Sequence, residues 1–117
     1  IVAQCGALIS KVLYIKKGVN TKFAILDAGM TELLRPALYQ AYHKIENISK
    51  SNISLNEKYD VVGPICESSD SFGKAVDLPE TNRGDLIALR TTGAYGEVMA
   101  SAYNLRAIAK AVYSDNI

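Results

Sequence analysis

The sequence has only one histidine, His43, and only two cysteines, Cys5 and Cys66, in 117 residues. Two cysteines are too few for a disulfide scaffold, and they lack the closely paired spacing of a zinc site. The short signatures of nucleotide-binding loops and of serine-hydrolase nucleophile elbows are also missing. These absences argue against the common metal, nucleotide and serine-hydrolase sites, and the unpaired thiols favour a reducing, cytoplasmic location.

Neither charge nor hydropathy is concentrated in one part of the chain. Thirteen Lys and Arg residues against twelve Asp and Glu residues give a net charge of +1. The basic residues are dispersed, which argues against a nucleic-acid partner. The most apolar stretch, residues 1–10, meets Lys11 long before the roughly 20 residues that a membrane-spanning helix needs. We therefore expect no nucleic-acid partner and no membrane partner.

What the sequence does have is the composition of a folded domain. With 49% hydrophobic residues, the chain is too apolar to be disordered and long enough to bury one core. It shows no internal repeat and no interdomain linker, so residues 1–117 are expected to form a single domain. Because the chain opens without a methionine in apolar, strand-like sequence, we also expect it to be one part of a larger protein.

The hydrophobic pattern is mainly that of β-strands. Short runs rich in Val, Ile, Leu and Tyr alternate with turn residues. These runs predict strands at residues 2–17 (with a bulge at Gly6), 22–27, 42–48, 59–66, 84–90 and 108–113. The turn residues at 18–21 join the first two strands in a predicted hairpin. The region from 38 to 48 also suits a helix, as does the last run. The other expected elements are a helical turn at 31–34 that ends before Pro36, a loop at 49–58, a turn or short helix at 68–72 and a short helix at 94–104.

These elements define the predicted fold class. Five to seven half-apolar strands, mostly antiparallel, bury their apolar faces most simply in a small β-barrel or sandwich. One or two short helices complete this mainly β architecture.

Two segments place reactive or charged side chains where they need a partner. Arg35 precedes Pro36 inside an apolar run, and a guanidinium pairs well with a carboxylate; the alternative is a surface arginine at a turn. Cys66 and Glu67 follow a strand that ends in Gly-Pro. A thiol there can donate a proton and a carboxylate can hold an ammonium group, whereas the alternative is a structural cysteine beside a capping acid.

A third segment presents an aromatic side chain. Tyr95 lies in a Gly-Ala-Tyr-Gly turn, whose glycines allow a tight backbone and direct the phenol outward. The phenol can then stack on a ring or donate to a phosphate or carboxylate, unless it only packs over the turn. His43 is expected to be a surface or strand-facing residue rather than a catalytic base.

Taken in order, these segments closely resemble the diaminopimelate decarboxylase family of pyridoxal-phosphate enzymes. The resemblance rests on residues 25–30, 35–39, 62–70, 84–85, 93–96, 99–101 and 103–104. It covers almost the whole chain and corresponds to the family's C-terminal β domain, which is that of the alanine-racemase-like decarboxylases. It is weakest at residues 49–58. Residues 104–108 depart from the Arg-Pro-x-Pro that the family tends to have, so the register of the last strand is left open.

The resemblance implies an activity and a set of site residues. Members of the family are cytoplasmic, homodimeric lyases that convert meso-2,6-diaminopimelate to L-lysine and CO₂ with pyridoxal 5'-phosphate. By this resemblance, Arg35 and Tyr39 bind a substrate carboxylate, and Cys66 is the catalytic proton donor. Glu67 binds the distal ammonium group of the substrate, and Tyr95 contacts both substrate and cofactor. The Cys-Glu pair would serve the barrel of the partner subunit.

The resemblance also implies that this chain is an incomplete enzyme. The family's cofactor lysine, its phosphate-binding loop and its Glu-Pro-Gly-Arg motif belong to an N-terminal (β/α)₈ barrel. Lys74 matches the context of that lysine only superficially. We therefore expect the isolated domain to be inactive, and to expose an apolar face that favours self-association.

Two other interpretations stay open. An ornithine-, arginine- or carboxynorspermidine-type decarboxylase would share the fold. Related ornithine and arginine decarboxylases usually have Cys-Asp where this chain has Cys66 and Glu67, so the Glu favours diaminopimelate. The second alternative is a free-standing β module that binds ligands or partners without catalysis.

Overall fold

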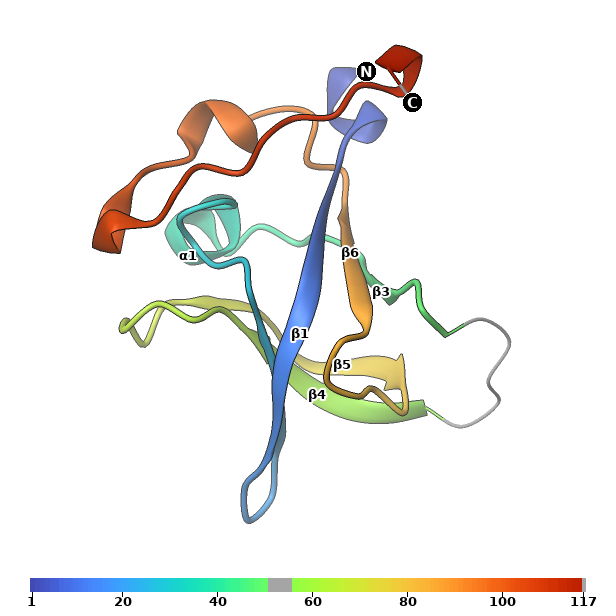
Figure 1. The fold of residues 1–117 in the computed structure, drawn as a ribbon. Helices are drawn as coiled ribbons and strands as arrows, with labels where there is room; N and C mark the ends of the chain where they lie inside the picture. The colour runs from blue at the N-terminus through green and yellow to red at the C-terminus, as the bar shows by residue number, and fades with distance from the viewer. Residues whose placement is uncertain (51–55, 117) are drawn as a thin grey trace.

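The computed structural model describes residues 1–50 and 56–116 (Figure 1). The described residues form six strands and one α-helix: β1 (Ala7–Lys17), β2 (Lys22–Leu26), α1 (Arg35–Tyr39), β3 (Ile45–Asn47), β4 (Asn56–Val62), β5 (Ser71–Pro79) and β6 (Leu86–Arg90). They also form short 3₁₀ helices: η1 (Val2–Cys5), η2 (Glu97–Met99), η3 (Tyr103–Leu105) and η4 (Ser114–Asn116).

The strands form one curled sheet in the order β3-β6-β1-β2-β4-β5. The long strand β1 is shared: Ala7–Lys11 pairs with β6, and residues 12–17 pair with β2. The β2–β4 pairing is parallel and the other four are antiparallel. Because the edge strands β3 and β5 contact each other, the sheet nearly closes into a barrel (Figure 1). This confirms the predicted fold class.

The hydrophobic core lies inside the curled sheet. Its buried members come from every strand and from the loop before α1: Val12, Ala24, Leu26, Leu33, Ile45, Tyr59, Val61, Phe72, Leu78, Ile87 and Leu89. In β4, buried Tyr59 and Val61 flank the less buried Asp60, the period of two that a strand with one buried face requires. Strand β6 is different, because Ile87, Ala88 and Leu89 are all buried. The core thus joins segments far apart in sequence.

The start of the chain differs from the predicted long strand. Residues 2–5 form η1, and β1 begins only at Ala7. The backbone of this end is tied to the turn after β6, since the Gly93 N–H donates to Ala3 O and the Thr92 N–H donates to Gly6 O. These tertiary hydrogen bonds replace the ladder that a continuous strand would make.

The helical turn predicted at 31–34 lies slightly earlier, where the Leu33 N–H donates to Gly29 O. The helix itself, α1, begins at Arg35 and has Pro36 in its first turn. The expectation that Pro36 disfavours helical geometry at Arg35 is not met. Proline is tolerated in the first turn of a helix because an N–H at that position has no intrahelical acceptor.

The strands in the middle of the chain also shift. The strand predicted at 42–48 is confined to Ile45–Asn47, and the one predicted at 59–66 runs from Asn56 to Val62. The predicted loop at 49–58 is therefore shorter, and its residues 51–55 lie outside the described residues. Strand β5 was not predicted, and it includes part of the turn or helix expected at 68–72. Its register against β4 is irregular and Ala75 has φ +49°, so no clean alternation marks it in the sequence.

The C-terminal segment, residues 91–116, has little regular structure. The helix predicted at 94–104 is replaced by η2 and η3, and positive φ angles at Tyr95, Asn104 and Leu105 interrupt it. The last predicted strand, 108–113, is not a strand, because no neighbouring strand pairs with it among the described residues. Figure 1 shows the segment passing α1 at one end of the sheet, and the Ser101 N–H donates to Thr31 O.

Candidate functional site

The turn between β4 and β5, residues 63–70, carries the predicted thiol and carboxylate. Cys66 is a free, exposed cysteine, and Glu67 beside it is also exposed. The turn is closed by its own backbone: the Gly63 N–H donates to Asp70 O at 3.1 Å, and the Glu67 N–H donates to Ile65 O at 2.9 Å. A compact turn therefore presents the thiol and the carboxylate to solvent at the end of a core strand.

The carboxyl group of Asp70 holds this turn through backbone hydrogen bonds. One oxygen, Oδ2, accepts the Ile65 N–H at 2.7 Å, and the other, Oδ1, accepts the Met30 N–H at 2.7 Å. Burial raises the pKa of Asp70, although the two N–H donors oppose the rise. The turn is thus attached to the loop that precedes α1.

Glu67 also has a partner in the C-terminal segment. The Tyr103 O–H donates to Glu67 Oε1 at 2.7 Å. This hydrogen bond raises the pKa of Tyr103 above its usual value of 10.0, so the phenol stays a donor at neutral pH. One carboxylate oxygen of Glu67 is therefore held by a phenol.

Helix α1 carries the predicted carboxylate-binding residues. Arg35 is its first residue and is half-buried, while the side chain of Tyr39 at its other end is 61% exposed. The preceding loop is braced by the buried Glu32, whose Oε2 accepts the Gly29 N–H at 2.6 Å. Arg106 of the C-terminal segment faces Glu32 at 3.7 Å and donates to Asp27 O. The loop that leads into the helix is thus held both by Glu32 and by Arg106.

Tyr95 lies in the turn that follows β6. It has φ +59° and its side chain is 65% exposed. An added Cβ would lie 2.2 Å from Val2 O at Gly93 and 2.4 Å from Thr92 O at Gly96, so only glycine fits at either position. The tight turn and the outward phenol that the two glycines predict are both present.

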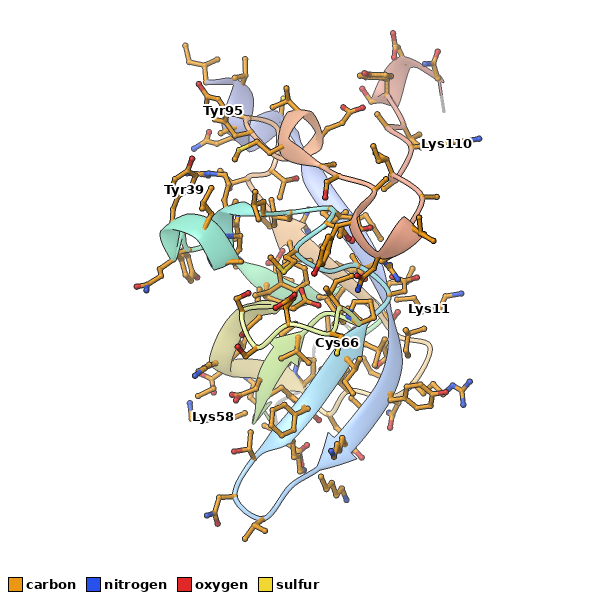
Figure 2. The ribbon with its side chains drawn as sticks, turned by 90° about the vertical axis from the view of Figure 1, so that its left-hand side faces the viewer. Lys11, Tyr39, Lys58, Cys66, Tyr95 and Lys110 are labelled. Atoms are coloured by element: carbon orange, nitrogen blue, oxygen red, sulfur yellow. The ribbon has the colours of Figure 1, made fainter. Side chains whose placement is uncertain are left out.

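The structure does not gather the five predicted site residues into one contact cluster. Figure 2 shows Tyr39 and Tyr95 towards the upper end of the view and Cys66 separate from both. Among the described residues, no side-chain hydrogen bond or ion pair joins any two of the five predicted residues, although Arg35 and Tyr39 share one turn of α1. Their joint action on one ligand stays a prediction.

Sequence reasoning missed the roles of Asp70 and Tyr103. Both lie in segments that carry the family resemblance, so a signal was present. The sequence could not reveal that the Asp70 carboxylate is buried between two loops, or that Tyr103 reaches Glu67 across 36 positions of the chain. Only the fold brings these groups together.

The single histidine has a structural environment. His43 is buried, and its Nδ1 lies 2.9 Å from Arg90 O. It is therefore strand-facing and not a surface residue.

Within residues 1–50 and 56–116 no group of three or more His, Cys, Asp or Glu side chains is arranged to hold a metal ion. No described helix combines the length and apolar composition that a membrane crossing requires.

The lysines do not provide an attachment site for pyridoxal phosphate within this chain. No lysine in the described part of the chain is buried, and Lys74 is exposed in β5. An exposed lysine that stays solvated is not set up to hold a carbonyl cofactor.

A cavity of about 690 Å³ lies between β1 and the C-terminal segment. Its apolar lining includes Leu8, Leu33, Ile108 and Val112. None of the five predicted site residues lines it, although Gly93 and Gly96 of the turn that carries Tyr95 do.

Comparison with known proteins adds independent support for the resemblance. The chain is 67% identical over 117 residues to diaminopimelate decarboxylase of Bacteroides thetaiotaomicron, covering 100% of this chain and 30% of that protein. It is 54% identical over 106 residues to diaminopimelate decarboxylase of Helicobacter pylori, covering 91% of this chain and 26% of that protein. The chain thus spans less than a third of the length of either relative.

The fold comparison agrees. The crystal structure of the Helicobacter pylori diaminopimelate decarboxylase complexed with L-lysine matches with a TM-score of 0.79 and 53% identity, over 88% of this chain and 25% of that one. The family model described as the pyridoxal-dependent decarboxylase C-terminal sheet domain matches residues 1–93. This match includes all six strands, α1, and every predicted site residue except Tyr95. The chain therefore belongs to the C-terminal sheet domain family of the pyridoxal-dependent decarboxylases.

Proposed function

We propose that residues 1–117 form the C-terminal domain of a diaminopimelate decarboxylase, which converts meso-2,6-diaminopimelate to L-lysine and CO₂. The observation that carries the proposal is the 67% identity over the whole chain to a diaminopimelate decarboxylase. The exposed Cys66-Glu67 pair on an anchored turn supports it further. An N-terminal domain would hold the cofactor, and this domain by itself would be inactive.

The substrate carries an amino-acid group at each end, and the end that does not react needs a charge clamp. Arg35 and Tyr39 on α1 would bind its carboxylate, since a guanidinium can make two parallel hydrogen bonds to such a group. Glu67 would pair with its ammonium group. The Tyr103 hydrogen bond to Oε1 of Glu67 leaves Oε2 for that ligand. A clamp of this kind rejects substrates without a distal charged group, because its own charges would stay unpaired.

Cys66 would supply the proton that replaces the lost CO₂. Pyridoxal 5'-phosphate, when bound, acts as the electron sink for the loss of CO₂. The Cys66 Sγ–H would donate its proton to the reacting carbon, and the thiolate would regain a proton from solvent. The free and exposed state of Cys66 supports this role. Tyr95 would contact the substrate and the cofactor from its rigid turn.

We also propose that the enzyme is a cytoplasmic homodimer in which the Cys66-Glu67 turn serves the barrel of the partner subunit. Two free, exposed cysteines fit a reducing compartment. Large exposed apolar side chains, among them Leu38, Tyr42 and Val98, fit a surface that other parts of the assembly cover.

The test uses the full-length enzyme that contains this domain. CO₂ release is measured with meso-diaminopimelate, ornithine, arginine and carboxynorspermidine, and only diaminopimelate is expected to be turned over rapidly. Cys66→Ala should bind the cofactor normally, as its absorbance spectrum would show, yet lose at least about 100-fold in kcat, as is usual when a general acid is removed. Full turnover by this variant would remove the proton-donor role, and preference for another substrate would overturn the proposed activity.

A further inference from the structure

Asp70 is buried beside the candidate site although its side chain is an ionisable carboxyl group. Asp70 is only 4% exposed, which is less than any other Asp or Glu in the described chain. Removing a carboxylate from water is costly unless hydrogen bonds or charges compensate. Whether burial of the Asp70 carboxyl group is compensated therefore depends on the groups that its two oxygens bind.

Each oxygen binds a different segment. Oδ2 accepts the N–H of Ile65, the residue directly before Cys66, and Oδ1 accepts the N–H of Met30, five residues before α1 begins. Both distances are 2.7 Å, and hydrogen bonds to an ionised acceptor are stronger than neutral ones. A single carboxylate thus joins the turn at 63–70 to the loop before α1.

The backbone packs closely around the Asp70 carboxyl group, and a side chain at Gly63 would not fit there. A Cβ on Gly63 would lie 2.4 Å from Asp70 Oδ2 and 2.5 Å from the Cα of Gly29. The two loops therefore approach each other directly over the carboxylate. Glu32 and Arg106 are the charged groups that act on it, with opposite effects on its pKa.

We propose that Asp70 is a positioning residue that sets the Cys66-Glu67 turn against the loop leading to α1. This inference rests on the proposed function, because it gives Asp70 the task of holding the proton donor and the ammonium-binding group in register with Arg35. The displacement of a reacting group by about 1 Å can cost on the order of 100-fold in rate. An anchor with two short hydrogen bonds is suited to prevent it.

Asp70→Asn in the full-length enzyme tests this role. The amide keeps the size of the side chain but replaces one acceptor oxygen with a donor, so one of the two N–H groups loses its partner. We expect kcat/KM for diaminopimelate to fall about 10- to 100-fold at a temperature where the variant is folded. Asp60→Asn is the matched control, since Asp60 accepts the Ala75 N–H at 2.8 Å on the same hairpin. The control should stay within about twofold of the unmodified enzyme.

A double-mutant cycle separates positioning from stability. If Asp70 acts through the reactive turn, Asp70→Asn should cause little further loss in an enzyme that already carries Cys66→Ala and Glu67→Gln. A residue with only a structural role would reduce kcat/KM by the same factor in both backgrounds. That result, or an equal loss in Asp60→Asn, would overturn the proposal.

Amide hydrogen exchange on the unmodified holoenzyme provides a measurement that needs no variant. The Ile65 and Met30 amides should exchange slowly, and they should do so although Cys66 and Glu67 between the strands are exposed. Exchange at the rate of free amides would overturn the anchor even if Asp70→Asn fails to fold. An unmodified enzyme that releases no CO₂ from diaminopimelate would instead overturn the proposed function, and the role of Asp70 in that reaction with it.

Discussion

At the scale of single residues, the chain separates groups that face solvent from groups that hold them there. Cys66, Glu67, Tyr39 and Tyr95 are exposed, whereas the carboxylate of Asp70 is buried beneath the turn at 63–70. Exposed side chains can adopt several rotamers, so how precisely they are placed to bind a ligand depends on the backbone that carries them. For Glu67, the Tyr103 hydroxyl adds a second constraint, because it donates to Oε1.

Glu67→Asp shortens the proposed ammonium-binding side chain by one methylene while keeping its charge. In the full-length enzyme we expect weaker discrimination between diaminopimelate and analogues that lack the distal amino group, with a loss of about 10-fold in the ratio of their kcat/KM values. Steady-state kinetics with both substrates measures this ratio. Unchanged selectivity would contradict the clamp.

Tyr103→Phe removes the hydroxyl that donates to Glu67 Oε1 and leaves the ring in place. Since the freed carboxylate is less well oriented, we expect the KM for diaminopimelate to rise about 3- to 10-fold, equivalent to the net worth of one hydrogen bond, with little change in kcat. Tyr113→Phe is a suitable control, because Tyr113 is an exposed tyrosine of the same segment. An equal effect in both variants would argue against a specific contact with Glu67.

At the scale of elements, the local pattern was most informative where a strand had one buried face and a clear turn beside it. The β1–β2 hairpin was predicted because turn residues at 18–21 separate two β-rich runs, and the Gly18 N–H does donate to Thr21 O. Strand β5 was missed because its irregular pairing with β4 disturbs the alternation. Helix α1 is not predicted from the sequence, because a residue before a proline usually avoids helical geometry, whereas the first turn of a helix tolerates proline.

Gly93→Ala tests the contact between the turn after β6 and η1. The new Cβ would lie 2.2 Å from Val2 O and 2.9 Å from Cys5 Sγ, so backbone must move. We expect the free energy of unfolding to fall by about 1–3 kcal/mol, the usual range for overpacking, as measured by urea denaturation. Gly84→Ala provides the comparison, because Gly84 has φ +93° but nothing within 4 Å. It should cost only the backbone strain of about 1–2 kcal/mol. A negligible cost at Gly93 would show that this contact is not close.

At the scale of the whole molecule, the sheet closes through pairings that the order of the strands along the chain does not reveal. The contact between the edges β3 and β5 nearly closes the sheet, and the parallel β2–β4 pairing places the loop before α1 and the turn at 63–70 at the same end of it. The buried Asp70 carboxylate lies at this junction. Its ionisation therefore affects the stability of the domain as a whole.

The pH dependence of stability should report that junction. Because burial raises the folded-state pKa of Asp70 above its usual value of 3.8, the folded chain binds this proton more tightly than the unfolded chain. The contribution of Asp70 to stability is then greatest below pH 3.8 and is lost as the pH rises through the folded-state pKa. In urea denaturation between pH 3 and pH 7, the stability of this chain relative to Asp70→Asn should increase as the pH falls. A relative stability that decreases on acidification would mean that the pKa of Asp70 is lowered.

The comparison with Asp70→Asn is needed because other carboxyl groups act in the opposite direction. Hydrogen bonds from Lys44 and Arg90 lower the pKa of Glu46, and a hydrogen bond from Lys22 lowers that of Glu57. Their stabilising effects are lost as the pH falls. Both are present in the unmodified chain and in the variant, so they cancel in the difference.

The sequence by itself determined the mainly β class, the first hairpin, the outward Gly-Ala-Tyr-Gly turn and the family resemblance. All of these depend on local residue patterns: alternation of apolar residues, turn-forming residues, and short motifs whose meaning does not need a partner. Only the tertiary structure decided that the last predicted strand would stay unpaired, that β2 and β4 would run parallel, and that Asp70 and Tyr103 would reach Ile65, Met30 and Glu67. The reason is physical, because a strand pairing or a buried hydrogen bond exists only when two distant segments exclude water together, and neither segment carries that information alone.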